Sequence, residues 1–386
     1  MKKQDIFLAS IGFVGALPMT LIGSVLSVRL KESGFDLVTI GLLSLFHLPF
    51  ALKPLLAPLV EQLRSPLRWM ERKAGWLTFA LTLTGLSVAG IAFFPSHPVL
   101  ILLLSFAEGL LFVAGLQVEM ALVPSVGQMR ASSCIVSGYR LGLLASGAGT
   151  LLLAEVIDWE SAYLVMASLF ILPLLFKVNL PQEFVPQKFS FVSPVKDLLK
   201  KGWPLFAFLV FYRLGDNLAN PMLHPFFLEI GFDKVDIAQV SKGIGMAATL
   251  AGVAVAGFFR EIRFSLLLFG LLHSFSFLLF SFLHLNPALF AGAVVFEHFT
   301  GGLVITAFIA MLWKEVTPRF GATQYALFWS IISLKQNVIA GFSGVLASFL
   351  GWPLFFGSIA AVSTLCAFFS LPLQLTSRLT PSKMET

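Results

Sequence analysis

The sequence predicts an all-α polytopic membrane protein with about twelve membrane-spanning helices, arranged as two similar six-helix halves. Hydrophobic residues make up 57% of the 386-residue chain and charged residues only 12%, about half the charged fraction of a soluble domain. The mean hydropathy is +0.89. The apolar residues gather in runs of about 20, the length of a helix that crosses a bilayer. Short stretches also recur at a similar offset, which indicates an internal repeat.

Each apolar run is expected to be helical, because backbone groups in lipid must be hydrogen-bonded within their own segment. Membrane-spanning strands would show stretches of about ten residues with alternating hydrophobicity, and no such stretch is present in the sequence. The expected helices cover residues 6–28, 38–60, 74–94, 98–120, 133–154, 161–180, 204–228, 237–259, 264–284, 288–312, 323–347 and 352–375.

The lysines and arginines between these runs predict the orientation of the chain. With the N-terminus in the cytoplasm, inside segments hold eighteen of them and outside segments three, namely Arg29, Lys31 and Lys234. Short cytoplasmic loops carry an excess of positive charge. Both termini are therefore predicted to be cytoplasmic, and the net charge of +6 is explained by topology, with no nucleic-acid partner expected.

An internal repeat divides the chain. Residues 34–40 (GFDLVTI) recur as residues 231–237 (GFDKVDI), each just before the second helix of a half. The predicted domains are an N-terminal six-helix bundle (1–180), a cytoplasmic linker (181–203), and a C-terminal six-helix bundle with a short tail (204–386). The linker holds three prolines and then a basic stretch, 196–201. We interpret that stretch as a solvated linker, with a short amphipathic helix on the membrane surface as the alternative.

Ionisable residues inside the predicted spans are the candidate functional residues, because each costs about 2.5–3.5 kcal/mol at the centre of a membrane helix on insertion scales. They are expected to face the bundle interior or a water-filled cavity. The candidates for proton coupling are Asp216, Glu297 and Glu108. The candidates for substrate binding are Arg140, Arg213, Asn217, Lys335 and Gln324.

The seventh span is the richest in polar groups. Arg213 and Asp216 are three residues apart, so they share a helix face and can pair. Asn217 follows, and Pro221 and Pro225 predict a kinked helix that lines a cavity. Asp216 is a candidate proton acceptor, with Arg213 tuning it or meeting an anionic substrate. A structural ion pair that fixes helix packing is the alternative.

The internal repeat relates the other candidates. Arg140 and Lys335, in the fifth and eleventh spans, are at equivalent positions and can flank an anionic substrate; snorkelling to the inner membrane face is the alternative. Glu108 and Glu297 lie in the fourth and tenth spans. A buried carboxylic acid suits proton coupling, although a neutral hydrogen-bonded packing role is the alternative. His47 and His298, also within spans, are interpreted as packing residues.

Sequence motifs for catalysis and metal binding are missing. The chain has no HExxH, CxxC, GxxxxGK[ST] or GxSxG pattern, so we expect no catalytic residue, no metal and no cofactor. The two cysteines, Cys134 and Cys366, lie in apolar runs and give no disulfide framework. Transport driven by ATP within this chain is not expected. An ion gradient or the gradient of the substrate itself is the expected energy source.

Several stretches along the chain resemble the AmpG-type muropeptide permeases, a branch of the major facilitator superfamily related to acetyl-CoA transporters. Residues 53–59 and Glu61 resemble the family's KFLWSPLMDR. The other matching stretches are residues 75–77 (GWL), 138–142 (GYRLG), 212–216 (YRLGD, family YKLGD), 231–233 (GFD), 240–242 (VSK, family VNK), 296–302 (FEHFTGG, family FENLCGG), 322–327 (ATQYAL, family ATQFAL) and 351–353 (GWP).

The resemblance implies a major facilitator fold and a secondary active transporter. Such a protein imports N-acetylglucosaminyl-anhydromuramyl peptides with protons by alternating access, for peptidoglycan recycling. It implies a multi-pass protein of the bacterial cytoplasmic (inner) membrane whose partners are its substrate, protons and lipid, and we expect a monomer. The fourth span departs from the family's acidic pattern QDIVFDAWKTD: Val113, Leu116 and Val118 replace an acid, a lysine and an acid.

Two other functions stay open from the sequence. One is transport of a different anionic solute, such as a nucleotide, a coenzyme or an organic acid. The altered fourth span and the retained Arg140 and Lys335 favour it. The other is a membrane-embedded enzyme or receptor, which would need a nucleophile or metal cluster near the membrane midplane or a large soluble domain. Neither is visible in the sequence, so we expect no enzymatic activity.

Overall fold

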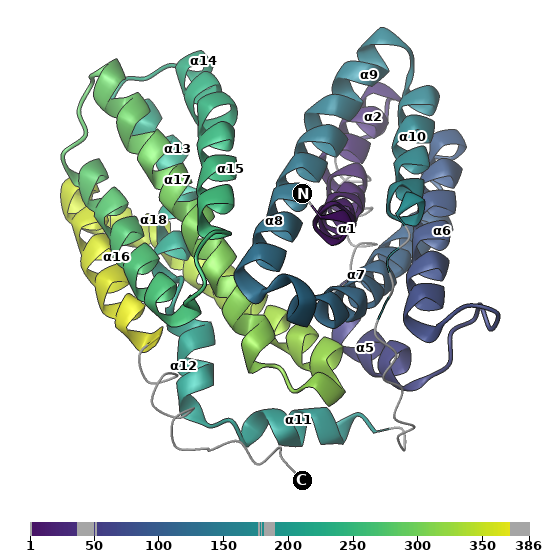
Figure 1. Cartoon of the computed structure of the whole chain (residues 1–386). Coiled ribbons are helices and arrows are strands. Elements are labelled where there is room, and N and C mark those ends of the chain that lie inside the picture. Colours follow the sequence, from purple (N-terminus) through teal and green to yellow (C-terminus); the bar gives the residue numbers. More distant parts are fainter. Residues whose placement is uncertain are drawn as a thin grey trace. The chain divides into compact units, whose positions relative to one another are not determined.

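The computed structural model describes residues 2–36, 50, 52–176, 178, 180 and 190–370. Every regular element within these residues is a helix, as Figure 1 shows, which confirms the all-α class for the described chain. Most of the predicted span 38–60, His47, residues 181–189 of the linker with Pro181 and Pro186, and the tail after residue 370 lie outside the described residues.

The chain forms two compact units. The first comprises Met1–Val195 and Val316–Leu327, and the second comprises Lys196–Glu315 and Phe328–Thr386. The short segment 316–327 therefore belongs by its contacts to the first unit, although it includes the first residues of the eleventh predicted span.

The first unit contains helices α1 to α10, some of them joined by short helical turns of another type. These elements are α1 (Lys3–Thr20), a π-helical turn (Leu21–Val25), α2 (Leu26–Glu32), α5 (Lys53–Gln62), α6 (Arg72–Phe93), α7 (Pro98–Val126), α8 (Gln128–Leu144), a π-helical turn (Ala145–Gly149), α9 (Thr150–Val156), α10 (Trp159–Ser168) and a 3₁₀ turn (Leu169–Leu175).

The remaining helices run from the linker through the second unit. They are α11 (Val192–Leu199), α12 (Trp203–Phe211), α13 (Leu214–Glu229), α14 (Lys234–Ile237), a π-helical turn (Ala238–Ile244), α15 (Gly245–Ala256), α16 (Ile262–Ser281), α17 (Pro287–Glu315), a 3₁₀ turn (Pro318–Phe320), α18 (Gly321–Ala367) and a 3₁₀ turn (Phe368–Ser370).

Eight helical stretches in the described residues are long and apolar enough to cross a membrane. One predicted span differs from the structure. The span predicted at 204–228 is interrupted between Phe211 and Leu214, where α12 ends and α13 begins. The spans predicted at 323–347 and 352–375 are confirmed as separate helices, because Gly351 (φ 71°) breaks the stretch labelled α18 at the predicted gap; glycine tolerates this positive φ because it has no Cβ.

Residues 192–199 form the short helix α11, within the segment that we interpreted as a solvated linker. The short helix that we gave as the alternative is present over residues 196–199 of the basic stretch, and its position on the membrane surface stays a prediction. Leu198 is buried, so one side of α11 packs against the protein. Lys200 and Lys201 follow the end of the helix.

Glycines bring two pairs of helices into backbone contact. In the first unit, a Cβ on Gly138 or Gly142 of α8 would overlap the carbonyl group of Ala9 or Phe13 of α1. In the second unit, a Cβ on Gly302 of α17 would overlap the Thr249 carbonyl of α15. Small residues at such positions allow membrane helices to approach closely and pack by van der Waals contact.

An aromatic core fixes the helices of the second unit. Phe226 and Phe227 of α13 contact Phe280 of α16, and Phe227 also meets Phe290 of α17 with ring centroids 4.8 Å apart. Phe356 of α18 lies 4.7 Å from Phe226. Buried aromatic rings contribute large contact areas and specific edge-to-face geometry. This core holds α13, α16 and α17 in one arrangement, and these are the helices that carry the polar cluster described next.

Candidate functional site

The interruption between α12 and α13 places an acidic residue at a helix N-terminus. Arg213 has non-helical backbone angles (φ −116°, ψ 34°), and α13 begins at Leu214, so that Asp216 lies in the first turn. Unpaired backbone N–H groups and the helix dipole make this position favourable for a carboxylate. The sequence predicted a kink from Pro221 and Pro225, but the interruption lies ahead of both prolines.

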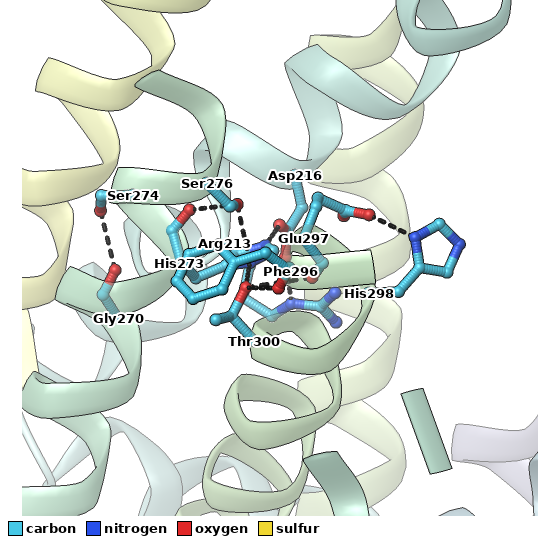
Figure 2. Close-up of polar contacts among 10 residues, drawn as sticks. All are labelled: Arg213, Asp216, Gly270, His273, Ser274, Ser276, Phe296, Glu297, His298 and Thr300. Carbon is cyan, nitrogen blue, oxygen red and sulfur yellow. Dashed lines mark hydrogen bonds and ion pairs between the residues drawn. The ribbon is translucent and has the colours of Figure 1, made fainter. Parts of the chain in front are cut away.

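Asp216 is the centre of a buried polar cluster drawn in Figure 2. Its Oδ2 accepts a hydrogen bond from Nε of Arg213 at 2.6 Å, so the pair predicted from the sequence spacing forms. Its Oδ1 lies 2.6 Å from Nε2 of His273 on α16. The other ring nitrogen of His273, Nδ1, lies 2.8 Å from Oγ1 of Thr300 on α17. Three helices therefore contribute to one continuous chain of hydrogen bonds.

The members of this cluster are shielded from solvent to different degrees. Asp216 and His273 are 6% and 5% exposed, and Thr300 is fully buried. Arg213 is less buried, with a side-chain exposure of 24%. A buried ion pair with good hydrogen bonds tolerates low-dielectric surroundings, whereas a buried charge without a partner is very costly. Arg213 is the charged group of the cluster that a solute can reach most readily.

Glu297 forms a separate contact with a histidine next to this cluster. Its Oε2 lies 2.7 Å from Nδ1 of His298, and Figure 2 shows its carboxylate directed to that ring. His298 packs over Gly245 of α15, where a Cβ would come within 2.7 Å of the ring. A Cβ on Gly301 would lie 3.5 Å from Cε1 of His273 and 4.0 Å from Glu297, so the two acid–histidine pairs are neighbours on either side of Gly301.

Two further predicted substrate-binding residues lie near Asp216. Lys335 of α18 is 9% exposed and lies within electrostatic range of Arg213 and Asp216. Asn217 follows Asp216 in α13, is 8% exposed, and its Nδ2 has no hydrogen-bond partner among the described residues. A buried amide donor without a partner costs free energy that a bound acceptor would recover.

The predicted residues of the first unit lie in α7 and α8. Glu108 of α7 is buried, and Lys53 of α5 lies within its electrostatic range. The Lys53 ammonium nitrogen is 4.1 Å from the ring centroid of Phe50 and 4.5 Å from that of Phe112, which is a cation–π arrangement. Arg140 of α8 is half-buried.

Gln324 has a local structural role. It is fully buried, its Oε1 accepts a hydrogen bond from the Thr317 backbone N–H at 2.8 Å, and its Nε2 donates to the Pro194 carbonyl at 3.3 Å. These bonds attach the start of α18 to the end of the linker. Its prediction as a substrate-binding residue stays untested, and its amide is already engaged in the described chain.

Glu61, in the segment after the predicted second span, binds the N-terminus of α18. Its Oε1 accepts hydrogen bonds from the backbone N–H groups of Ala322 (2.6 Å) and Thr323 (3.3 Å), and its Oε2 accepts one from the Thr323 hydroxyl. Burial raises the pKa of Glu61 to about 6, although these hydrogen bonds and Arg72 act in the opposite direction.

Sequence reasoning missed His273 and Thr300. His273 lies within the predicted span 264–284, and a histidine in an otherwise apolar membrane helix is a usable signal. Thr300 is a common residue in membrane helices and carries no such signal. Only the packing of α13, α16 and α17 shows that the two side chains meet Asp216. Among the described residues, no group of three or more His, Cys, Asp or Glu side chains is placed to hold a metal ion.

Comparisons with known proteins agree with this architecture. The family profile of the Major Facilitator Superfamily matches residues 8–335. The chain is 31% identical to a protein named AmpG 4 from Rickettsia conorii, over 90% of both chains. It is 27% identical to the anhydromuropeptide permease of Escherichia coli, over 92% of this chain and 76% of the permease. These matches confirm the resemblance found in the sequence.

Solved structures show the same fold at low identity. The Escherichia coli fucose:proton symporter FucP matches with a TM-score of 0.69 and 16% identity, over 95% of this chain and 98% of FucP. The human organic anion transporter MFSD10 matches with a TM-score of 0.66, also at 16% identity and over the same shares of the two chains. At this level of identity the likeness concerns the fold alone.

Proposed function

Because this chain belongs to the Major Facilitator Superfamily and, within it, to the AmpG-type transporters, we propose that it imports muropeptides together with protons by alternating access. The Arg213–Asp216–His273 cluster is the observation that carries the proposal. Ionisable groups are costly inside a membrane protein and are retained mainly where they bind ions or substrates. A transporter without proton or anion chemistry would have little need of them.

The cluster suits a substrate that carries carboxylates. Muropeptides are acidic, and Arg213 offers a partly exposed guanidinium, the group best suited to paired hydrogen bonds with a carboxylate. Lys335 adds a second positive charge within electrostatic range. The unpartnered Nδ2 of Asn217 supplies a donor for a carboxylate or peptide carbonyl oxygen. Asp216 is the proposed proton-coupling residue.

The proposal includes the finer features expected from the sequence. Both termini are cytoplasmic, the protein lies in the bacterial inner membrane and works as a monomer, and Arg140 with Lys335 flanks the substrate. Glu297 and Glu108 are the second-rank protonatable groups.

Uptake into proteoliposomes tests this function. The labelled substrate is N-acetylglucosaminyl-anhydromuramyl peptide, presented with and without an inward proton gradient. Gradient-dependent accumulation is the expected result, and an Asp233→Asn variant, which alters an exposed acid at the start of α14, serves as the matched control with unchanged uptake. No uptake by folded, correctly reconstituted protein would overturn the muropeptide assignment, and a nucleotide or organic acid accumulated in its place would identify a different anionic substrate.

A further inference from the structure

His273 is the buried titratable group that the proposed function leaves without a role. It projects from α16 and its two ring nitrogens contact two different helices, Asp216 of α13 at 2.6 Å and Thr300 of α17 at 2.8 Å. A ring held at both nitrogens has its tautomer and charge determined by those two partners. The chemistry of the cluster therefore depends on which hydrogen atoms the partners supply.

The hydroxyl group of Thr300 can act either as donor or as acceptor toward His273. It has one hydrogen atom and can rotate it. Besides Nδ1 of His273, two acceptors lie within reach of Oγ1, the carbonyl oxygens of Phe296 at 2.9 Å and of Glu297 at 3.0 Å. The hydrogen can point to Nδ1, or it can point to a carbonyl oxygen and leave Oγ1 to accept from an Nδ1–H group.

Each orientation of the hydroxyl matches one protonation state of the cluster. With neutral His273, Nε2–H donates to the ionised Asp216 and Nδ1 accepts from Thr300. With one proton more, Nδ1–H donates to Thr300, whose hydrogen turns to the Phe296 or Glu297 carbonyl, while Nε2–H still donates to Asp216. Asp216, His273 and Thr300 remain hydrogen-bonded to one another in both states. Neither state therefore leaves a buried polar group without a partner, which would cost free energy.

The neighbouring groups on each packed helix agree with this exchange. Ser276 on α16 donates its own hydroxyl hydrogen to the His273 carbonyl at 2.7 Å, and its oxygen is 3.5 Å from Nδ1. The charged groups that act on His273 are Arg213 and Asp216 of α13 and Glu297 of α17. The Glu297 carboxylate is paired with His298 (Figure 2), so Asp216 is the acid in direct contact with the ring.

We propose that Asp216, His273 and Thr300 form a one-proton binding site in which rotation of the Thr300 hydroxyl accompanies the gain or loss of the proton. The proton comes from a hydronium ion: one of its O–H bonds breaks, water is released, and one N–H bond forms at Nδ1. His273 carries this proton, Asp216 stabilises the charged ring through Nε2–H, and Thr300 is the positioning residue.

Proton binding at this site changes the local charge. Without the proton, the positive charge of Arg213 and the negative charge of Asp216 cancel. With the proton bound, the cluster has a net charge of one positive unit. That charge favours an anionic substrate beside Arg213, and by linkage the bound anion favours the proton. This consequence for transport rests on the proposed function, but the proton site itself does not, because it is defined by groups of the protein alone.

Nitrogen NMR of histidine-labelled full-length protein in lipid nanodiscs tests the site without any substrate. The chain has six histidines, and the resonances absent from a His273→Gln variant identify His273. We expect these resonances to titrate between an Nε2–H neutral ring and a doubly protonated ring. His284→Gln, which removes an exposed histidine between α16 and α17, is the matched control and should leave them unchanged.

Substitutions at Thr300 separate the proposed role from simple packing. Thr300→Val removes a hydrogen bond that is stronger to the charged ring than to the neutral one, so the His273 titration should move to lower pH by about one unit. Thr300→Ser retains the hydroxyl and should restore the wild-type midpoint. A His273 ring that stays in one protonation state throughout the accessible pH range would overturn the proposal, as would equal midpoints for Thr300→Val and the wild type.

The outcomes distinguish the proton site from the transport function. If His273 titrates but the protein does not take up the muropeptide, the proton site is supported and the substrate assignment is wrong. If uptake is driven by the gradient but His273 does not titrate, the transport function is supported and the proton site is wrong. Normal coupling in His273→Gln would lead to the same conclusion. Thr300→Ser and His284→Gln also show whether substitutions in this unit leave the protein folded.

Discussion

Helices α7 and α17 are alike in design and differ in what surrounds their acidic residue. Each has 29 residues, begins with proline and carries a buried glutamate as its eleventh residue, Glu108 or Glu297. Glu108 lies near a lysine held between two phenylalanine rings, whereas Glu297 lies beside a buried histidine cluster. Two helices of similar length and sequence layout thus contribute to a cation–π cluster in one unit and to a hydrogen-bonded acid–histidine cluster in the other.

The residues that follow each glutamate explain the difference. The three positions Thr300, Gly301 and Gly302 of α17 correspond to Leu111, Phe112 and Val113 of α7. The threonine supplies a hydroxyl to His273, and the glycines leave room for the His273 ring and for the α15 backbone. In α7 the bulky Phe112 fills this space and covers Lys53. The two helices thus differ in side-chain size at the positions that face these neighbours in α17.

The largest expected effect comes from Asp216→Asn, which removes the acid that distinguishes the second unit. An inward gradient of one pH unit supports about tenfold accumulation when one proton accompanies each substrate. The variant should lose this factor in proteoliposome uptake and keep downhill exchange. Normal uphill uptake by folded Asp216→Asn would exclude Asp216 from coupling and would leave the comparison between the two units without a functional meaning.

Gly302→Ala should destabilise the second unit. The new Cβ meets the Thr249 carbonyl of α15, and overpacking of this kind costs about 1–3 kcal/mol. Thermal unfolding in detergent measures the effect. Gly292→Ala in the same helix is the control, because a Cβ there meets open space, and this change should slightly stabilise the helix. Equal melting temperatures for the two variants would show that the close approach is not needed.

Glu61→Gln isolates a pH dependence that belongs to the first unit. Burial raises the Glu61 pKa from 4.5 to about 6, so the folded protein binds this proton more tightly than the unfolded chain does. The stabilising contribution is complete below pH 4.5 and is lost as the pH rises through 6, a change of about 2 kcal/mol. The stability difference between wild type and Glu61→Gln should decline over this interval, and a constant difference would contradict the assignment.

Lys53→Met and Glu108→Gln should give the smallest effect. We expect a coupling energy of about 1 kcal/mol in a double-mutant cycle measured by unfolding. Lys53→Met retains the apolar stem that packs between Phe50 and Phe112, and the accumulation ratio of this variant under a proton gradient should not change. A lost accumulation ratio would place proton coupling in both units and would end the contrast drawn between α7 and α17.

Much of the fold could be predicted from the sequence, because each apolar run has to satisfy its own backbone in lipid. The contact between Arg213 and Asp216 followed from their spacing on one helix. The interruption before Leu214 and the meeting of His273 with Asp216 and Thr300 could not be predicted in this way. They depend on how three helices from distant parts of the chain pack, and no local pattern encodes that arrangement. Gln324 shows the converse: a polar residue in a matching stretch that stabilises backbone at the start of α18.

The glycine contact between α15 and α17 has a mechanical consequence. The backbones of α15 and α17 touch at Gly252 and Gly302, so no side chains separate the two helices there. The two helices therefore resist sliding past each other and are expected to move as one rigid pair. Thr300 lies in α17, one helix of this rigid pair. Asp216 lies in the first turn of α13, just after the interruption between α12 and α13. A displacement of α13 relative to α17 would therefore lengthen or shorten the hydrogen bonds that join Asp216, His273 and Thr300.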